Sequence, residues 1–403
     1  MTSDPWSTAT RPPVRFGALV AALIASALAI VGLAPIAEAA ATDYTVTATI
    51  PVGTTPTYSV PCNGELYVAN MNSNTVSVVD PSTNTVTLTI PAAVNVYALA
   101  CDGGFVYTAD YGANTSSIIS TATHAIVATV PVGAGPSGII VVDGHAYVTN
   151  QSAGTVSIYN TSTRTVTDTV TVNGFPSGLA THNGKVYVSN LSSSYQQIGV
   201  IDTSTRTAGI PITVPGNSRV IGTSGGFLYV NIEGAPANTM VRVDLANTAS
   251  QTSVSLPASP TGIAFNNGDI YISSYGGNAV YVLDQATLTL TQTISVPGSP
   301  SIITVSGNSA YVTAQSGNNV QVIAVPGPQP SPSYAPDAPP IWFQSIGRTG
   351  ESCPEGWTSS WEQWPNDGLG GPVCNRVLFH SGAGWWSAPD LREGPFTPWS
   401  PTA

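Results

Sequence analysis

Residues 145–160 read HAYVTNQSAGTVSIYN, two short runs of alternating apolar residues on either side of a polar turn. Such alternation, rich in Val, Ile, Tyr and Thr, is typical of β-strands. Nearly the same phrase returns as ELYVANMNSNTVSVVD at 65–80, KVYVSNLSSSYQQIGVID at 185–202 and DIYISSYGGNAVYVLD at 269–284. The opening stretch is therefore one copy of a repeat, and the repeat decides the fold.

The period of the repeat is 40 to 42 residues, measured between tyrosines that occupy one position of the phrase: Tyr67, Tyr107, Tyr147, Tyr187, Tyr229, Tyr271 and Tyr311. Most units also carry Asn-Gly or Asp-Gly, which supply the positive φ angles of tight hairpins. Five units place Asp or Asn at the start of a second turn, where its side chain can bond the backbone ahead: Asp80, Asn160, Asp202, Asp244 and Asp284. Each unit thus contains four strands, and seven such units predict an all-β, seven-bladed β-propeller over 44–326.

The two ends of the repeat array predict how the ring closes. The seventh unit stops after its third strand, NNVQVIAV, while a spare strand, YTVTATI, begins at Tyr44 before the first unit. The N-terminal strand is therefore expected to complete the last blade. Asparagine three residues after the tyrosine is expected to pin the following turn.

The words YVAN, YVTN and YVSN at these spacings resemble the YVTN family of β-propeller repeats, which occur in surface-layer and exported microbial proteins. Units two, five and seven depart from the motif with YTAD, YVNI and YVTA. The resemblance implies the propeller fold, an exported location and a binding or scaffold role. It does not imply one activity, because a fold does not fix a function.

The first 39 residues have the features of a secretory signal peptide. Arg11 and Arg15 precede a long apolar run that ends in the small-residue pattern Ala37-Glu38-Ala39. The alternative is an uncleaved membrane anchor. No later apolar run is long enough to span a bilayer, so we expect a secreted, extracellular or cell-surface protein. A net charge of −11 with ten basic residues disfavours nucleic-acid binding.

The four cysteines form an even set, as expected of an exported chain: Cys62, Cys101, Cys353 and Cys374. We predict the pairs Cys62–Cys101 and Cys353–Cys374, with free buried thiols as the alternative.

Beyond the repeats, residues 327–340 form a Pro/Ser-rich linker and residues 341–403 a small Trp-rich module stapled by the second disulfide. The segment CPEGWTSSWEQWPNDGLGGPVCNRV resembles a short C-terminal module of exported actinobacterial proteins. Trp357, Trp361 and Trp364 are candidates for contact with a cell-envelope glycan. The alternative is that these rings build the module's own core, since small domains need large aromatics to fold, or that they dock on the propeller.

The mouth of the propeller is expected where a recurring proline begins the innermost strand. The proline is present in five of the seven units, and the position after it carries, in order, Thr57, Tyr97, Ser137, Ser177, Arg219, Thr261 and Ser301. Arg219 is a candidate binding residue for the carboxylate or phosphate group of a ligand. The alternative is that Arg219 is structural and bonds to blade carbonyls or to an acid such as Glu233. Further candidates on this face, suited to a sugar or small anion, are the aromatic residues Tyr58, Tyr97, Phe175, Tyr195 and Tyr275.

These features predict a monomeric, non-enzymatic binding or scaffold protein at or outside the cell envelope, with a glycan or a surface protein as partner. No cofactor and no metal are expected. The competing hypothesis is a propeller hydrolase or lyase of the lactonase kind. It gains support if two or more of Asp110, Glu233 and the histidines of the repeats meet at the mouth, because acid–base catalysis needs positioned groups.

Overall fold

The computed structural model describes residues 44–233 and 238–325, together with the backbone of four strands between 341 and 387. The chain divides into two compact units, 1–328 and 329–403.

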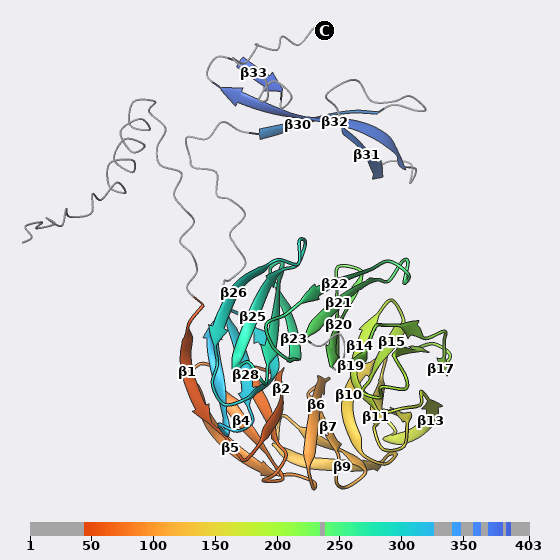
Figure 1. Ribbon diagram of the computed structural model, residues 1–403, viewed down its shortest axis with the longest axis vertical. Coiled ribbons are helices and arrows are strands. Elements are labelled where there is room, and N and C mark those ends of the chain that lie inside the picture. Colours follow the sequence, from red (N-terminus) through yellow and green to blue (C-terminus); the bar gives the residue numbers. More distant parts are fainter. Residues whose placement is uncertain are drawn as a thin grey trace, which may run out of the picture. The chain divides into compact units, whose positions relative to one another are not determined.

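The first unit is a ring of seven antiparallel sheets, with the first strand of each sheet nearest the axis (Figure 1). Blades one to three consist of β2 (Pro56–Cys62), β3 (Glu65–Asn70), β4 (Thr75–Asp80) and β5 (Thr85–Pro91); β6 (Val96–Asp102), β7 (Phe105–Asp110), β8 (Thr115–Ser120) and β9 (Ala125–Pro131); and β10 (Pro136–Val142), β11 (His145–Asn150), β12 (Thr155–Asn160) and β13 (Thr165–Thr171). Blades four and five consist of β14 (Pro176–His182), β15 (Lys185–Asn190), β16 (Gln197–Asp202), β17 (Thr207–Ala208) and β18 (Ile212–Thr213); and β19 (Asn217–Ser224), β20 (Phe227–Glu233), β21 (Thr239–Asp244) and β22 (Gln251–Ser255). Blades six and seven consist of β23 (Pro260–Asn266), β24 (Asp269–Ser274), β25 (Ala279–Asp284) and β26 (Leu290–Ser295); and β27 (Pro300–Ser306), β28 (Ser309–Ala314), β29 (Asn319–Ala324) and β1 (Val46–Pro51). The seven-bladed propeller is confirmed.

The ring closes as the sequence predicts, through the N-terminal strand. β1 pairs antiparallel with β29, and Ile50 lies opposite Val320. Ile50 is 1% exposed and packs with residues of blades seven and one, among them Tyr311 and Leu66. The other residues of β1 are exposed or half-buried, so this strand has one fully buried anchor.

The hydrophobic core lies between neighbouring blades and explains why the phrase recurs. The seven repeat tyrosines lie in the second strand of each blade, and none is more than 4% exposed. Between blades one and two, for example, Tyr67 and Val78 pack with Val96 and Leu99. A single four-stranded sheet cannot bury both of its faces, so each blade needs its two neighbours.

The turns follow the predicted chemistry. Asn63 and Gly64 adopt φ angles of 50° and 84° in the first hairpin. All five predicted Asp or Asn side chains accept a hydrogen bond from the backbone N–H two or three residues ahead; Asp80 Oδ1, for instance, accepts from Ser82 N at 2.8 Å. Two of the asparagines expected to pin the next turn bond across it: Asn70 Nδ2 donates to Thr75 Oγ1 at 3.2 Å and Asn150 Nδ2 to Thr155 Oγ1 at 3.0 Å. Asn190 Nδ2 instead donates to Asn173 O, and its Oδ1 accepts from Ser192 N.

Blade four departs from the expected four strands. Its outermost strand is split into β17 and β18, and both pairs are made with β16. The break contains Gly209 and Pro211. Proline has no N–H to donate to a ladder, which is why the strand is interrupted here.

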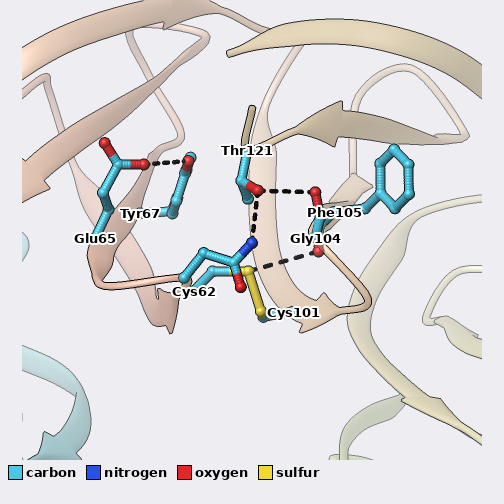
Figure 2. Close-up of a disulfide and its surroundings, with 8 residues drawn as sticks. Cys62, Glu65, Tyr67, Cys101, Gly104, Phe105 and Thr121 are labelled. Carbon is cyan, nitrogen blue, oxygen red and sulfur yellow. Dashed lines mark hydrogen bonds between the residues drawn. A yellow bond between two sulfur atoms is a disulfide. The ribbon is translucent and has the colours of Figure 1, made fainter. Parts of the chain in front are cut away.

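The Cys62–Cys101 disulfide is confirmed, and it joins the ends of β2 and β6 in adjacent blades (Figure 2). It lies on the face that carries the hairpins between first and second strands, opposite the mouth; we call this the hairpin face. Beside it Asn63 Nδ2 donates to Thr121 Oγ1 at 2.8 Å, and Thr121 Oγ1 donates to Gly104 O at 2.9 Å. Covalent and polar contacts therefore fasten blade one to blade two.

The second unit contains one sheet, with strand order β30 (Ile341–Gly347), β32 (Gly370–Ser381) and β31 (Thr358–Gln363), and β33 (Gly384–Ser387) paired with β32. Trp361 lies on β31 opposite Pro372, and Cys374 lies on β32. Cys353, Trp357 and Trp364 lie outside the described residues, as do the predicted signal peptide and linker. The second disulfide and the glycan contact stay predictions. In the described part of the chain, no helix is long and apolar enough to cross a membrane.

Candidate functional site

The mouth of the propeller is built from the seven residues that follow the start of each inner strand. All seven, from Thr57 to Ser301, line one cavity of about 50 Å³ together with Tyr58. The register of the repeat brings them together, because each is the second residue of the strand nearest the axis, or the third in blade five. Arg219 is the one of them that carries a charge.

Three of the five serine and threonine hydroxyl groups of the mouth bond to the neighbouring blades. Thr57 Oγ1 donates to Tyr97 O at 2.7 Å, Ser137 Oγ to Pro176 O at 3.1 Å, and Thr261 Oγ1 to Pro300 O at 3.0 Å. Thr149, Ser189 and Ser273, on the second strands, donate to the backbone of the next inner strand in the same way. These side chains form an inter-blade belt, and each net bond contributes about 1 kcal/mol to the ring.

Arg219 is engaged within the protein. Its Nη1 lies 2.6 Å from Glu233 Oε1, at the end of the paired strand β20. Burial lowers the pKa of the guanidinium, but its interactions with Tyr97 and Glu233 outweigh this effect and raise the pKa above its ordinary value. Tyr97 comes from blade two and Arg219 from blade five, and both line the mouth cavity. The structure thus shows the acid partner that the sequence analysis held as the alternative.

The six candidate residues fall into two groups. Arg219, Tyr97 and Tyr58 line the mouth cavity, and desolvation raises the pKa of the half-buried Tyr58. Phe175, Tyr195 and Tyr275 are 54%, 42% and 45% exposed and do not line that cavity. Tyr195 instead borders a separate pocket of about 200 Å³ on blade four. The expected aromatic ring around Arg219 therefore consists of two tyrosines.

The acid and base groups of the repeats do not meet at the mouth. Asp110 ends β7 and accepts hydrogen bonds from Thr108, Thr115 and Ser117 at 2.6, 3.0 and 2.7 Å. Burial raises the pKa of the Asp110 carboxyl. His145 Nδ1 bonds Asp143 O on the hairpin face, and His182 ends β14 near the same face. Among the described residues, no group of three His, Cys, Asp or Glu side chains is placed to hold a metal ion.

One polar cluster was missed from the sequence. Glu65 Oε2 accepts a hydrogen bond from Tyr67 at 2.7 Å and lies 2.9 Å from His124 Nε2. Figure 2 shows Glu65 and Tyr67 beside the disulfide. His124 belongs to blade two, so the cluster is another link between blades one and two. Glu65 and His124 are 59 residues apart in the sequence, and no sequence motif predicts their contact.

A wider section of the axial channel, which the sequence analysis also missed, lies below the mouth. It has a volume of about 430 Å³ and shares Tyr58, Ile139, Leu179, Val220 and Ile302 with the mouth cavity. The two cavities are therefore sections of one channel. The signal was present in inner strands such as 138–142, GIIVV, which are apolar on both faces instead of alternating.

Comparison with known proteins supports the fold and no more. No family model and no curated protein matches this chain, so the YVTN resemblance stays a prediction from the motif. Among solved structures, hydrazine synthase of Kuenenia stuttgartiensis is similar with a TM-score of 0.59 and 18% identity, over 68% of this chain and 97% of that one. At this identity the likeness shows a shared β-propeller architecture, and that protein's activity is not transferred.

Proposed function

We propose that this protein is an exported, non-enzymatic binding or scaffold propeller that acts at or outside the cell envelope. The observation that carries the proposal is the state of the mouth. Its charged pair, Arg219 and Glu233, is mutually bonded, and three of its hydroxyls hold neighbouring blades. Because these side chains bond to other groups of the protein, they support a rigid ring whose surfaces are presented to a partner.

The predicted signal peptide and the Trp-rich module support the location. Tryptophan faces pack well against sugar rings, and Trp357, Trp361 and Trp364 are closely spaced. In this proposal the module retains the protein at an envelope glycan, and the propeller presents its faces to a second partner, such as a surface protein.

A retention assay tests the proposal. The full chain and a version ending at Pro326 are incubated with cell-envelope fractions, and the bound protein is quantified. We expect retention of the full chain and loss of retention without the module. Equal retention of both versions would assign the attachment to the propeller, and Arg219→Ala would then test the mouth. Retention of neither version refutes the envelope proposal and returns the hydrolase or lyase hypothesis to first place.

A further inference from the structure

We infer that the pocket on blade four, with a volume of about 200 Å³, is a binding site for one uncharged sugar residue. The inference goes beyond the proposed function. The glycan contact proposed above belongs to the Trp-rich module, whereas this pocket belongs to the propeller, and neither site requires the other.

Three departures of blade four from the repeat meet at this pocket. The connection between its second and third strands, 191–196, is two residues longer than the corresponding 151–154 of blade three, and it carries Tyr195. The third strand has Gly199 where blades one to three have serine. The outermost strand is interrupted at Pro211. Residues from all three departures line the pocket, so it is a feature of this blade and not of the repeat.

In blade three the corresponding space is occupied by bonded side chains. Asn150 Nδ2 donates to Thr155 Oγ1 at 3.0 Å and to Ser157 Oγ at 2.9 Å, and blade one repeats both bonds. Blade four has Gln197 and Gly199 in place of the threonine and the serine, so both hydroxyls are lost. The substitutions leave room at the foot of the longer connection.

The polar groups of the pocket are free, unlike those of the mouth. Asn173, Gln197 and Tyr195 line the pocket with exposed side chains. Within the part of the chain that the structure describes, neither of these two amides nor the Tyr195 hydroxyl forms a side-chain hydrogen bond. Each amide can both donate and accept, so together they can bond several hydroxyl groups of a ligand.

The lining also indicates the class of the ligand. None of the described residues that line the pocket carries a charge, so a charged ligand would lose hydration without gaining a counter-ion. The ring of Tyr195 is 42% exposed, and such a ring offers an apolar face to the C–H groups of a sugar. The pocket is smaller than the range of about 300–1,000 Å³ of drug-sized sites, so it suits one ring and not a longer chain.

Two positions allow the pocket to be altered without touching the mouth. Tyr195→Ala removes the exposed ring. Gly199→Gln fills the space with the side chain that blade seven has at this position, Gln321. A Cβ atom at residue 199 would lie 3.3 Å from Val172 Cγ1, so Val172 must shift slightly. Gly199→Ser, which introduces the residue of blades one to three, replaces it if the larger side chain prevents folding. Tyr275→Ala is the matched control, because Tyr275 is 45% exposed and lies outside the pocket.

The experiment traps the bound sugar covalently, since the affinity for a single ring is expected to be weak, on the order of 1 mM. The purified full chain is irradiated with methyl glycosides that carry a diazirine, in the gluco, galacto, manno and N-acetylglucosamine configurations, and labelled peptides are identified by mass spectrometry. We expect at least one probe to label the segment 191–211. An excess of the same sugar without the diazirine should suppress this labelling, and glucuronate, which is charged, should not. Labelling should fall at least fivefold in Tyr195→Ala and Gly199→Gln, about threefold in Gly199→Ser, and remain unchanged in Tyr275→Ala.

Three results would overturn the inference. The first is that no probe gives sugar-suppressible labelling of 191–211. The second is equal labelling of the wild type, Tyr195→Ala and a folded Gly199 variant. The third is equal suppression by glucuronate and by the neutral sugar. Labelling confined to 341–403 would overturn this inference and support the glycan contact of the module, so the inference and the proposed function can fail separately.

Discussion

Replacing Ile50 by alanine tests how the ring is closed. β1 is the one strand of the seven blades that is not joined to its blade by a short turn, and Ile50 is its one fully buried side chain. The substitution deletes three carbon atoms from the core between blades seven and one.

The expected cost follows from that burial. Three buried carbons at about 0.8 kcal/mol each give a transfer term of about 2.4 kcal/mol. The cavity left among Leu66, Val68 and Tyr311 raises the total to about 3–4 kcal/mol, within the range measured for Ile to Ala changes.

The matched control is Ile90→Ala. Ile90 is 4% exposed and holds the equivalent position in β5, opposite Val76, but its strand is tied to β4 by a turn. Both variants should lower the free energy of unfolding in urea by about 3 kcal/mol. Only Ile50→Ala should accelerate hydrogen exchange selectively in β1 and β29, by about a hundredfold, because 1.4 kcal/mol corresponds to a factor of ten. Val46→Ala, at an exposed position, should change little.

The reasoning is refuted if Ile50→Ala costs less than about 1 kcal/mol, or if its exchange pattern matches that of Ile90→Ala. Closure would then depend on backbone pairing and not on this side chain.

Three further predictions concern the blades. Cys62→Ala with Cys101→Ala should lower the unfolding free energy by about 3–4 kcal/mol, the chain-entropy value for a sequence separation of 39, and reduced wild type should show the same loss in urea. Burial raises the pKa of Asp110 above its ordinary value of 3.8, so the folded state holds a proton that the unfolded state has released, and stability should fall as pH rises through the interval between these two pKa values. Asp110→Asn, which introduces the residue found in blades one, three and four, should abolish this decrease of stability with pH, as measured by urea titrations at several pH values. If the decrease is unchanged in the variant, another titratable group causes it. Arg219→Ala and Glu233→Gln should each destabilise the protein, and a double-mutant cycle should give a coupling of about 1 kcal/mol, since both side chains are about one-third exposed; additive effects would show that the ion pair contributes nothing.

The fold could be predicted almost completely because a repeat multiplies weak local signals. One stretch of alternating residues does not determine a fold. Seven tyrosines at a constant spacing define the length of a blade and the register of its strands, and they show that the seventh unit lacks its fourth strand. Blade four could not be predicted in detail, because the effect of Pro211 depends on whether its backbone must donate to β16.

The mouth could be predicted in part. The seven positions around the axis follow from strand register alone. Glu233, named as an example of an acid partner, is close to Arg219 because β20 pairs with β19. Whether Phe175, Tyr195 and Tyr275 approach the axis depends on the path of their loops, which residue spacing does not determine. The Glu65–His124 pair joins blades one and two, and only the packing of these two blades brings the side chains together.

The pairing of β1 with β29 also has a mechanical consequence. The strands are antiparallel, and Val46 pairs with Ile323, so the chain enters and leaves the propeller at neighbouring points. Tension between the two ends would load this pair as a zipper, in which hydrogen bonds break one after another and not all at once. Continuous chain crosses all seven junctions between blades, including residues 52–55 from β1 to β2, and the junction of blades one and two is also locked by the Cys62–Cys101 bridge. The β1–β29 pair, within blade seven, is the one strand pair of the ring that joins the two ends of the propeller chain and has no connecting turn. A pulled molecule should therefore open first at this single seam and leave the remaining blades stacked.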